Sequence, residues 1–211
     1  MVRHSTFAGW SDFRLAAANL AIGRGERTLA SRLCFSLAGG QALVVSGRNG
    51  AGKSTLLRTL AGLLPALGGT ISVAGEGLEA GEPAGQRAHF LGHADGMKST
   101  LSVRENLEFW AAMLDVGAGG LSAREALEAV ELPHTADFPA AYLSAGQKRR
   151  VALARLLVAH RPLWLLDEPT TALDAAAQAR FAGIARAHLA LDLDGAIELG
   201  LDALSDDRTG G

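Results

Sequence analysis

The residues best suited to chemistry in this sequence lie at positions 47–55, where glycines, a lysine and two hydroxyls follow the spacing G-x-x-x-x-G-K-[ST]. Glycines at this spacing let backbone amides close around anionic oxygens, and a following helix adds the positive end of its dipole. Lys53 can reach the β- and γ-phosphates of a nucleotide, and the Ser54 hydroxyl can ligate Mg²⁺. The predicted triphosphate site consists of Gly47, Arg48, Asn49, Gly50, Ala51, Gly52, Lys53, Ser54 and Thr55.

Such a loop needs a strand before it and a helix after it. Residues 42–45 form an apolar run that predicts a buried strand, and residues 55–61 have the spacing of a helix that ends before Gly62. The alternative, a chance match in a glycine-rich chain, does not account for this context.

A second group of reactive side chains follows another apolar run. Residues 163–166 predict a buried parallel strand that ends in Asp167 and Glu168, and α/β sheets bind ligands at the carboxyl ends of their strands. Asp167 is predicted to help hold Mg²⁺, and Glu168 to orient and polarise the attacking water. Phosphoryl transfer needs little more than such positioning and charge neutralisation.

A third motif opens a helix. Ser144 and Gln147 form a capping box, which predicts a helix from there to about Ala159. A helix that begins with an exposed serine hydroxyl and a glycine, Gly146, offers a second surface for anions. Taken alone, the motif is equally compatible with a helix that is merely well capped.

The remaining chain places these groups in an α/β fold. Short apolar runs between glycines at 15–37 predict antiparallel strands, and capping boxes at Ser102 and Ser122 predict helices. The alternation of helix and strand in the last third of the chain favours a mostly parallel sheet. The prediction is one domain, 1–211, with a core of about 13–94 and 140–211 and a helical subdomain of about 95–139.

Composition argues against several partners. The formal charge is −2, which gives no global basic field for binding nucleic acid. The single cysteine, Cys34, supports neither a disulfide framework nor a cysteine-rich metal site and is predicted to pack in the core. The sequence shows no apolar segment of membrane-spanning length and no signal peptide, so direct membrane insertion is not expected.

In order and spacing, these motifs resemble the ATP-binding-cassette (ABC) ATPases. The resemblance covers roughly residues 15–189, and the five-residue motif at 143–147 is specific to that superfamily among phosphate-loop proteins. The matching residues are 47–55, 143–147, 167–170 and 172–174.

The resemblance implies a P-loop NTPase core with a mostly parallel sheet, an N-terminal antiparallel β subdomain and an inserted α-helical subdomain. It implies hydrolysis of ATP with Mg²⁺ by a head-to-tail homodimer. Ser144, Gly146 and Gln147 would contact the ATP held by the partner copy, and Asp174 would lie at the dimer seam.

A narrower resemblance links residues 91–98, 101–110 and 147–155 to the ATP-binding subunits of bacterial haem exporters for cytochrome c maturation. It implies a peripheral subunit on the cytoplasmic face of the inner membrane, coupled to integral membrane permease subunits of a haem-handling complex. His93 stands where most cassettes have glutamine, and it would contact the Mg²⁺ shell or the γ-phosphate. The alternative is a solvent-facing loop histidine.

Two stretches depart from the family pattern. Residues 22–27 lack the aromatic residue on which adenine stacks, and Arg24 is the candidate to stack in its place. Near the C-terminus, residues 197–201 alternate as an edge strand, the family's switch strand is predicted to be missing, and His188 is predicted to be a helix-surface residue. We therefore expect nucleotide binding with slow turnover.

The favoured function is the ATP-hydrolysing motor subunit of a membrane transporter, for haem handling in c-type cytochrome biogenesis. A nucleotide-binding regulatory module with impaired hydrolysis would explain the C-terminal departure, but it has no need for Glu168. A soluble ABC ATPase unrelated to transport usually has paired cassettes, a coiled-coil arm or basic extensions, and the sequence contains none of these.

Overall fold

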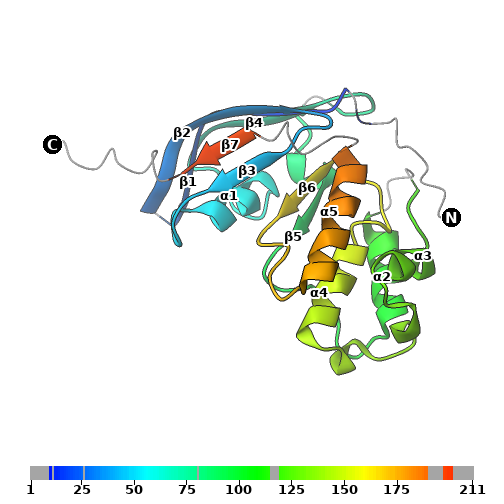
Figure 1. The fold of residues 1–211 in the computed structure, drawn as a ribbon. Coiled ribbons are helices and arrows are strands. Elements are labelled where there is room, and N and C mark those ends of the chain that lie inside the picture. The colour runs from blue at the N-terminus through cyan, green and yellow to red at the C-terminus, as the bar shows by residue number, and fades with distance from the viewer. Residues whose placement is uncertain are drawn as a thin grey trace. The chain divides into compact units, whose positions relative to one another are not determined.

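The computed structural model describes residues 10, 12–25, 27–79, 81–114, 119–189 and 197–201. The chain divides into two compact units, and Figure 1 shows the elements of both. The first unit is Met1–Phe90 with Ala185–Gly211, and the second is Leu91–Ile184.

The first unit contains a three-stranded antiparallel sheet in the order β2–β1–β4. Its central strand, β1 (Arg14–Arg24), pairs antiparallel with β2 (Arg27–Ala38) on one side and β4 (Gly68–Ala74) on the other. The turn between β1 and β2 is short and includes Gly25, whose φ of 55° suits glycine. The antiparallel strands predicted within residues 15–37 are therefore confirmed.

The side chains that fill the first unit are aliphatic. Leu15, Leu20 and Ile22 of β1 are at most 1% exposed, and Leu33 of β2 is fully buried. Cys34 contradicts the predicted core position: it is exposed on β2, where the Asn19 amide donates to its sulfur at 3.3 Å. Successive residues of a strand point to opposite faces, so the neighbour of buried Leu33 faces outward.

The predicted strand before the phosphate loop is β3 (Leu43–Ser46), which pairs parallel with β7 (Ile197–Gly200). This pairing confirms the strand predicted at 197–201. The predicted burial of β3 is wrong, since Val44 is 52% exposed. Side chains of a strand point to the two faces of the sheet, and Val44 lies on a face that is not covered; among the described residues, β7 is the only strand paired with β3.

Helix α5 (Ala175–Leu189) precedes β7 in the chain. His188 lies in its last turn and is half-buried, so it is a helix residue, as predicted, although part of its side chain is covered. The chain between α5 and β7 is residues 190–196, which lie outside the described residues. The prediction that the switch strand is missing falls on this stretch and stays a prediction.

Helix α1 (Lys53–Leu60) follows the phosphate loop and buries Leu56 and Leu60. It ends at Leu60, and Gly62, just beyond the end, has a φ of 72°, the left-handed conformation typical of a residue after a helix. The Gly62 amide donates to the Thr59 carbonyl at 3.0 Å, which satisfies one of the last carbonyls of the helix. The predicted helix and its end are confirmed.

The second unit contains three helices that begin at capping boxes. The serine at each start accepts from the amide three residues on, and the Glu or Gln there accepts from the serine amide. Hydrogen bonds from Ser102 to the Glu105 carboxylate, chiefly from its backbone amide and then from its hydroxyl, lower the pKa of Glu105. The helices are α2 (Val103–Leu114), α3 (Ala123–Ala129) and α4 (Ala145–Ala154).

Helix α4 is shorter than the sequence predicts, ending at Ala154 rather than near Ala159. The next amides bond to carbonyls three residues back rather than four: Leu156 to Leu153 and Leu157 to Ala154, both at 3.0 Å. This tighter winding is typical of the last turn of a helix.

The core of the second unit also holds a charged group. The Arg155 guanidinium carbon lies 4.3 Å from the centroid of the Trp110 ring, and the Trp110 indole donates to the Gly96 carbonyl at 3.1 Å. Burial lowers the pKa of Arg155 to about 10, so the side chain stays charged at neutral pH. The aliphatic residues of this core include Leu107, Leu127, Leu132, Leu153 and Leu156.

The remaining elements are two strands and three short turns of 3₁₀ helix. The amide of Asp167, just after β6, donates to the carbonyl of Leu91, the last residue of β5, at 2.8 Å. Within the described residues, no helix combines the length and the apolar character needed to cross a membrane. These elements are β5 (Ala88–Leu91), β6 (Leu163–Leu166), η1 (Ala84–Arg87), η2 (Pro133–Thr135) and η3 (Ala140–Tyr142).

Candidate functional site

The phosphate loop connects β3 to α1 in the first unit. Gly47, Gly50 and Gly52 have φ values of 141°, 87° and 110°, which other residues adopt only with strain. Gly52 is the N-cap of α1 and offers no side chain to the first amides of the helix. These amides are therefore left to bind an external anion, as at other glycine-rich helix starts.

The side chain of Lys53 folds back over this loop. Its ammonium group donates to the carbonyls of Gly47 at 2.6 Å and Arg48 at 3.0 Å. The positive charge is thus held within the loop, at the helix end where the dipole favours an anion.

Thr55 gives a further sign that a ligand belongs here. Its side chain is 1% exposed, and its hydroxyl oxygen has no hydrogen-bond partner in the described part of the chain. Buried hydroxyls without partners are costly, so a polar ligand group at the start of α1 would satisfy it. The glycine conformations, the ammonium group and this hydroxyl fit a nucleotide phosphate.

The two predicted carboxylates follow β6 in the second unit. Asp167 is buried, at 8% exposed, whereas Glu168 is exposed. Glu168 has a φ of 49°, unusual for a residue with a side chain, and its carboxylate accepts a hydrogen bond from the Thr171 hydroxyl at 3.2 Å. The backbone therefore turns at Glu168 and leaves its carboxylate at the surface, held by one neighbour.

The predicted anion-binding helix start is α4. Gln147 accepts from the Ser144 amide at 2.9 Å, and Ser144 accepts from the Gln147 amide at 3.2 Å. The cap uses the Ser144 hydroxyl as an acceptor, so its own proton is available to donate to another group. At Gly146 an added Cβ would come within 3.2 Å of the Ala172 carbonyl oxygen, so even alanine would crowd that loop.

The last two predicted residues lie in loops of the second unit. His93 is exposed in the loop after β5. The Asp174 carboxylate accepts from the Ala177 amide at 2.8 Å, so it caps α5. A part in a dimer seam stays a prediction for Asp174, as does phosphate contact for His93.

The predicted site residues thus fall into two groups, one in each compact unit. Positions 47–55 belong to the first unit. The second unit contains His93, Ser144, Gly146, Gln147, Asp167, Glu168 and Asp174.

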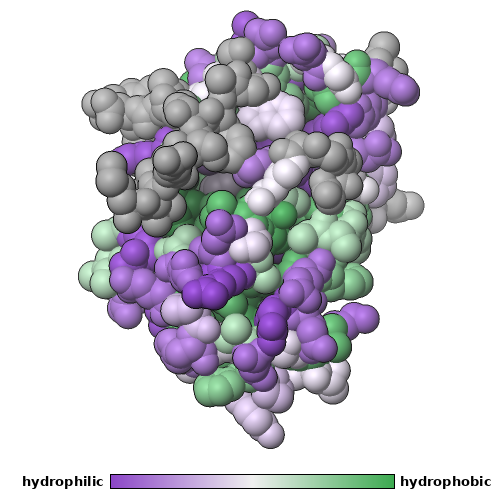
Figure 2. All heavy atoms as spheres, turned by 90° about the vertical axis from the view of Figure 1, so that its right-hand side faces the viewer, coloured by the Kyte–Doolittle hydropathy of each residue, from purple (hydrophilic) through white to green (hydrophobic). Residues whose placement is uncertain are grey.

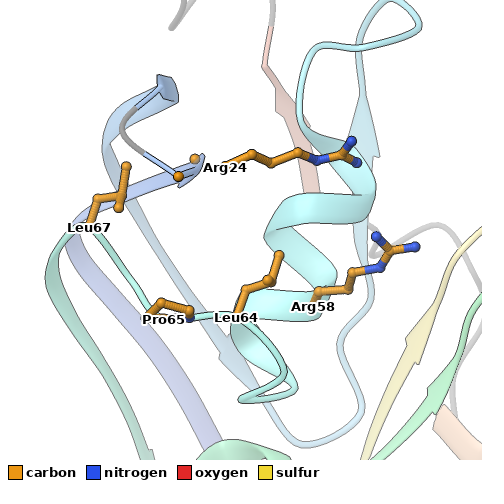
Figure 3. Close-up of a pocket in the computed structure, with 7 residues that line it drawn as sticks. Arg24, Arg58, Leu64, Pro65 and Leu67 are labelled. Atoms are coloured by element: carbon orange, nitrogen blue, oxygen red, sulfur yellow. The ribbon is translucent and has the colours of Figure 1, made fainter.

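A cavity of about 410 Å³ lies in the first unit, between the β1–β2 turn and the end of α1. Arg24, the predicted substitute for an adenine-stacking aromatic, lines it together with Arg58. Figure 3 shows both side chains extending in the same direction, one from β1 and one from α1. Adenine stacking on Arg24 stays a prediction. The other lining residues are Gly23, Gly25, Leu64, Pro65 and Leu67.

Arg149 is a residue that the sequence analysis missed. The residue is 4% exposed, and its guanidinium donates to the carbonyls of Asp167 and Glu168. The signal in the sequence is its helical spacing from Leu153 and Leu156, which puts an arginine on an apolar helix face. An arginine on such a face must find buried acceptors.

Comparisons with known proteins agree with these observations. Residues 30–171 match the ABC transporter family. The chain is 53% identical to the cytochrome c biogenesis ATP-binding export protein CcmA of Chelativorans sp. (strain BNC1) over 176 residues, which are 83% of this chain and 86% of that protein. It is 49% identical to the CcmA protein of Brucella abortus (strain 2308) over 208 residues, covering 90% and 93% of the two chains.

Solved structures show the same fold. A putative ABC transporter ATP-binding protein from Pyrococcus furiosus matches with a TM-score of 0.72 and 22% identity, covering 91% of this chain and 99% of that one. The ATP-binding cassette MJ0796, a dimer bound to ADP and Pi, matches with a TM-score of 0.71 and 23% identity, covering 88% and 87%.

Proposed function

This chain belongs to the ABC transporter family as an ATP-binding ATPase, and from that premise we propose that it drives a bacterial exporter for cytochrome c biogenesis, with haem as the cargo. The observation that carries the proposal is the similarity to CcmA export proteins: over most of the chain, about half of the aligned residues are identical. The phosphate loop and the carboxylates after β6 supply the residues that such a motor requires.

In this proposal, residues 47–55 bind the triphosphate of ATP, and Lys53 neutralises its β- and γ-phosphates. The unpartnered Thr55 hydroxyl supports this assignment. Ser54 and Asp167 would hold Mg²⁺, which would supply positive charge to the phosphate oxygens. Glu168 polarises the attacking water, and His93 contacts the γ-phosphate.

A second copy of the chain completes the site. The hydroxyl proton of Ser144 and the backbone at Gly146 and Gln147 would bind the γ-phosphate of ATP held by the partner copy. Asp174 would lie at the seam between the copies. The cap at Ser144 supports this role, because it fixes the hydroxyl at a helix start that favours anions.

The membrane partners would be integral permease subunits, with this chain bound peripherally on the cytoplasmic face of the inner membrane. Residues 95–139 are the proposed helical subdomain, and exposed apolar side chains on it support contact with a partner. They are Phe109, Met113 and Phe138, which are 42%, 52% and 51% exposed. On the face drawn in Figure 2, hydrophobic residues lie among hydrophilic ones.

Purification from membranes tests this function. We expect the tagged full-length chain, extracted in mild detergent, to retain polytopic membrane proteins identifiable by mass spectrometry. A Phe109→Ser/Met113→Ser double variant should retain fewer of them while binding ATP normally, because those side chains are exposed and belong to the second unit, whereas the phosphate loop belongs to the first. Retention of ribosomes or DNA, with no membrane protein, would instead support a soluble ABC ATPase.

The C-terminal part favours a second candidate, a cassette that binds nucleotide but hydrolyses it slowly. The observation is that β3 has one paired neighbour in the described residues and leaves Val44 half-exposed. We expect steady-state phosphate release by the complex with its membrane partners to be slower than the 1–100 s⁻¹ that is roughly typical of phosphoryl-transfer enzymes. A rate inside that range would refute impairment and leave the motor function standing.

A further inference from the structure

Arg149 of α4 has five acceptors around its five N–H groups. Nε donates to the Pro169 carbonyl at 3.1 Å, and Nη1 donates to the Gly92 carbonyl at 2.9 Å. Nη2 donates to the carbonyls of Asp167 at 3.0 Å and Glu168 at 2.6 Å. Nη1 also lies 3.5 Å from a carboxylate oxygen of Asp95.

This arrangement is specific to a guanidinium. A charged group that is 4% exposed is costly to bury unless its donors are all satisfied. Arginine presents its donors in a rigid planar fork, whereas lysine offers one compact ammonium group. The next residue on α4, Arg150, provides a contrast, since within the described residues its guanidinium donates only one hydrogen bond, to the Val130 carbonyl at 3.4 Å.

The first segment that Arg149 holds is the turn after β6. Glu168 has a left-handed φ of 49°, which persists in a residue with a side chain only when its surroundings impose it. Arg149 binds the carbonyls of Asp167, Glu168 and Pro169, and so fixes the backbone on both sides of that residue. The direction of the Glu168 carboxylate depends on this backbone.

The second segment is the loop that carries His93. Arg149 binds the Gly92 carbonyl on one side of His93 and faces Asp95 on the other. Asn106 on α2 holds the same loop further along, since its carboxamide accepts from the Lys98 amide at 2.8 Å and donates to the Lys98 carbonyl at 3.0 Å. The His93 loop is thus tied to α4 through one side chain.

We propose that Arg149 is a positioning residue, which sets the Glu168 backbone and the His93 loop in fixed register with α4. Ser144 caps the same helix, α4. A phosphate bound at that cap would therefore be linked to the position of Glu168 through the guanidinium of Arg149. This inference rests on the proposed function, in which Glu168 polarises water and Ser144 meets the ATP of the partner copy. All of the contacts lie within the second unit.

The test is the Arg149→Lys variant, assayed in the complex with its membrane partners. We expect kcat to fall on the order of 10²-fold, because a small misplacement of a catalytic group has that effect. The KM for ATP and the dissociation constant of the nucleotide should change far less than kcat, since the phosphate loop is untouched and only the His93 contact to the γ-phosphate would weaken. Arg150→Lys is the matched control and should turn over like the wild type.

The outcomes separate this inference from the proposed function. No ATP hydrolysis by the wild-type complex would overturn the proposed function itself. With an active wild type, an Arg149→Lys variant that melts normally and keeps wild-type kcat overturns the inference, as does a loss confined to KM. If Arg149→Lys does not fold, Asp95→Asn decides: lower kcat at unchanged KM supports the inference, and unchanged kcat overturns it.

Discussion

Replacing Lys53 with alanine should weaken nucleotide binding and abolish ATP turnover, and it should leave the fold intact. The ammonium group lies over the phosphate loop, where it donates to the carbonyls of Gly47 and Arg48 at 2.6 Å and 3.0 Å. With ATP bound, we expect it to exchange these acceptors for β- and γ-phosphate oxygens, in charge-assisted bonds about twice as strong as neutral ones. Removing one hydrogen-bond donor to the charge that develops in the transition state lowers kcat on the order of 10²–10³-fold.

Steady-state phosphate release by the complex and nucleotide binding by the chain measure the two parts of this prediction. Lys98→Ala is the control, since it removes the same charge from the second unit, where its ammonium lies 5.4 Å from the Phe109 ring centroid. Thermal unfolding should show a loss of no more than about 3 kcal/mol, because each of the two partly exposed hydrogen bonds contributes roughly 0.5–1.5 kcal/mol. Wild-type turnover in Lys53→Ala would refute the assignment of the phosphate loop.

Features that depend on a few neighbouring residues were predictable from the sequence. The capping boxes at Ser102, Ser122 and Ser144 are formed as expected, because both partners of each box lie within four residues. The glycines of the phosphate loop adopt positive φ for the same local reason, since only glycine accepts those conformations without strain.

Features that depend on distant partners were not predictable. The apolar run of β3 predicts a buried strand, but burial requires distant elements to pack over both faces of the sheet, and Val44 is 52% exposed. Cys34 lies in an apolar run yet is exposed, because strand register decides which face it takes. Helix α4 ends at Ala154, earlier than predicted, because the backbone hydrogen bonds change there from four residues back to three. No glycine or proline next to Ala154 marks this change in the sequence.

The candidate site shows the same division. Its motifs identify the phosphate loop, the carboxylates after β6 and the cap of α4. They do not identify Arg149, whose acceptors at Gly92, Asp167, Glu168 and Pro169 are between 18 and 57 residues away in the sequence. Only the fold brings those carbonyls to one guanidinium.

Replacing Glu168 with glutamine should preserve ATP binding, stop hydrolysis and trap a dimer of the chain. Glutamine has the same shape and keeps an oxygen that can accept from the Thr171 hydroxyl, now at 3.2 Å from the carboxylate. It cannot take a proton from the attacking water, and a general base typically contributes about 10²–10⁴-fold to the rate. ATP would then remain bound between the phosphate loop of one copy and the Ser144 cap of the other.

Sizing chromatography with light scattering, with and without Mg·ATP, measures this directly. We expect a nucleotide-dependent dimer of Glu168→Gln, and a monomer when Ser144→Ala is added, because the added change removes the hydroxyl at the α4 cap. Glu108→Gln is the matched control: it makes the same change at an exposed position on α2 and should give no stable dimer. A Glu168→Gln chain that binds ATP yet stays monomeric at all concentrations would contradict the shared site, because trapping requires the partner copy to close over the nucleotide.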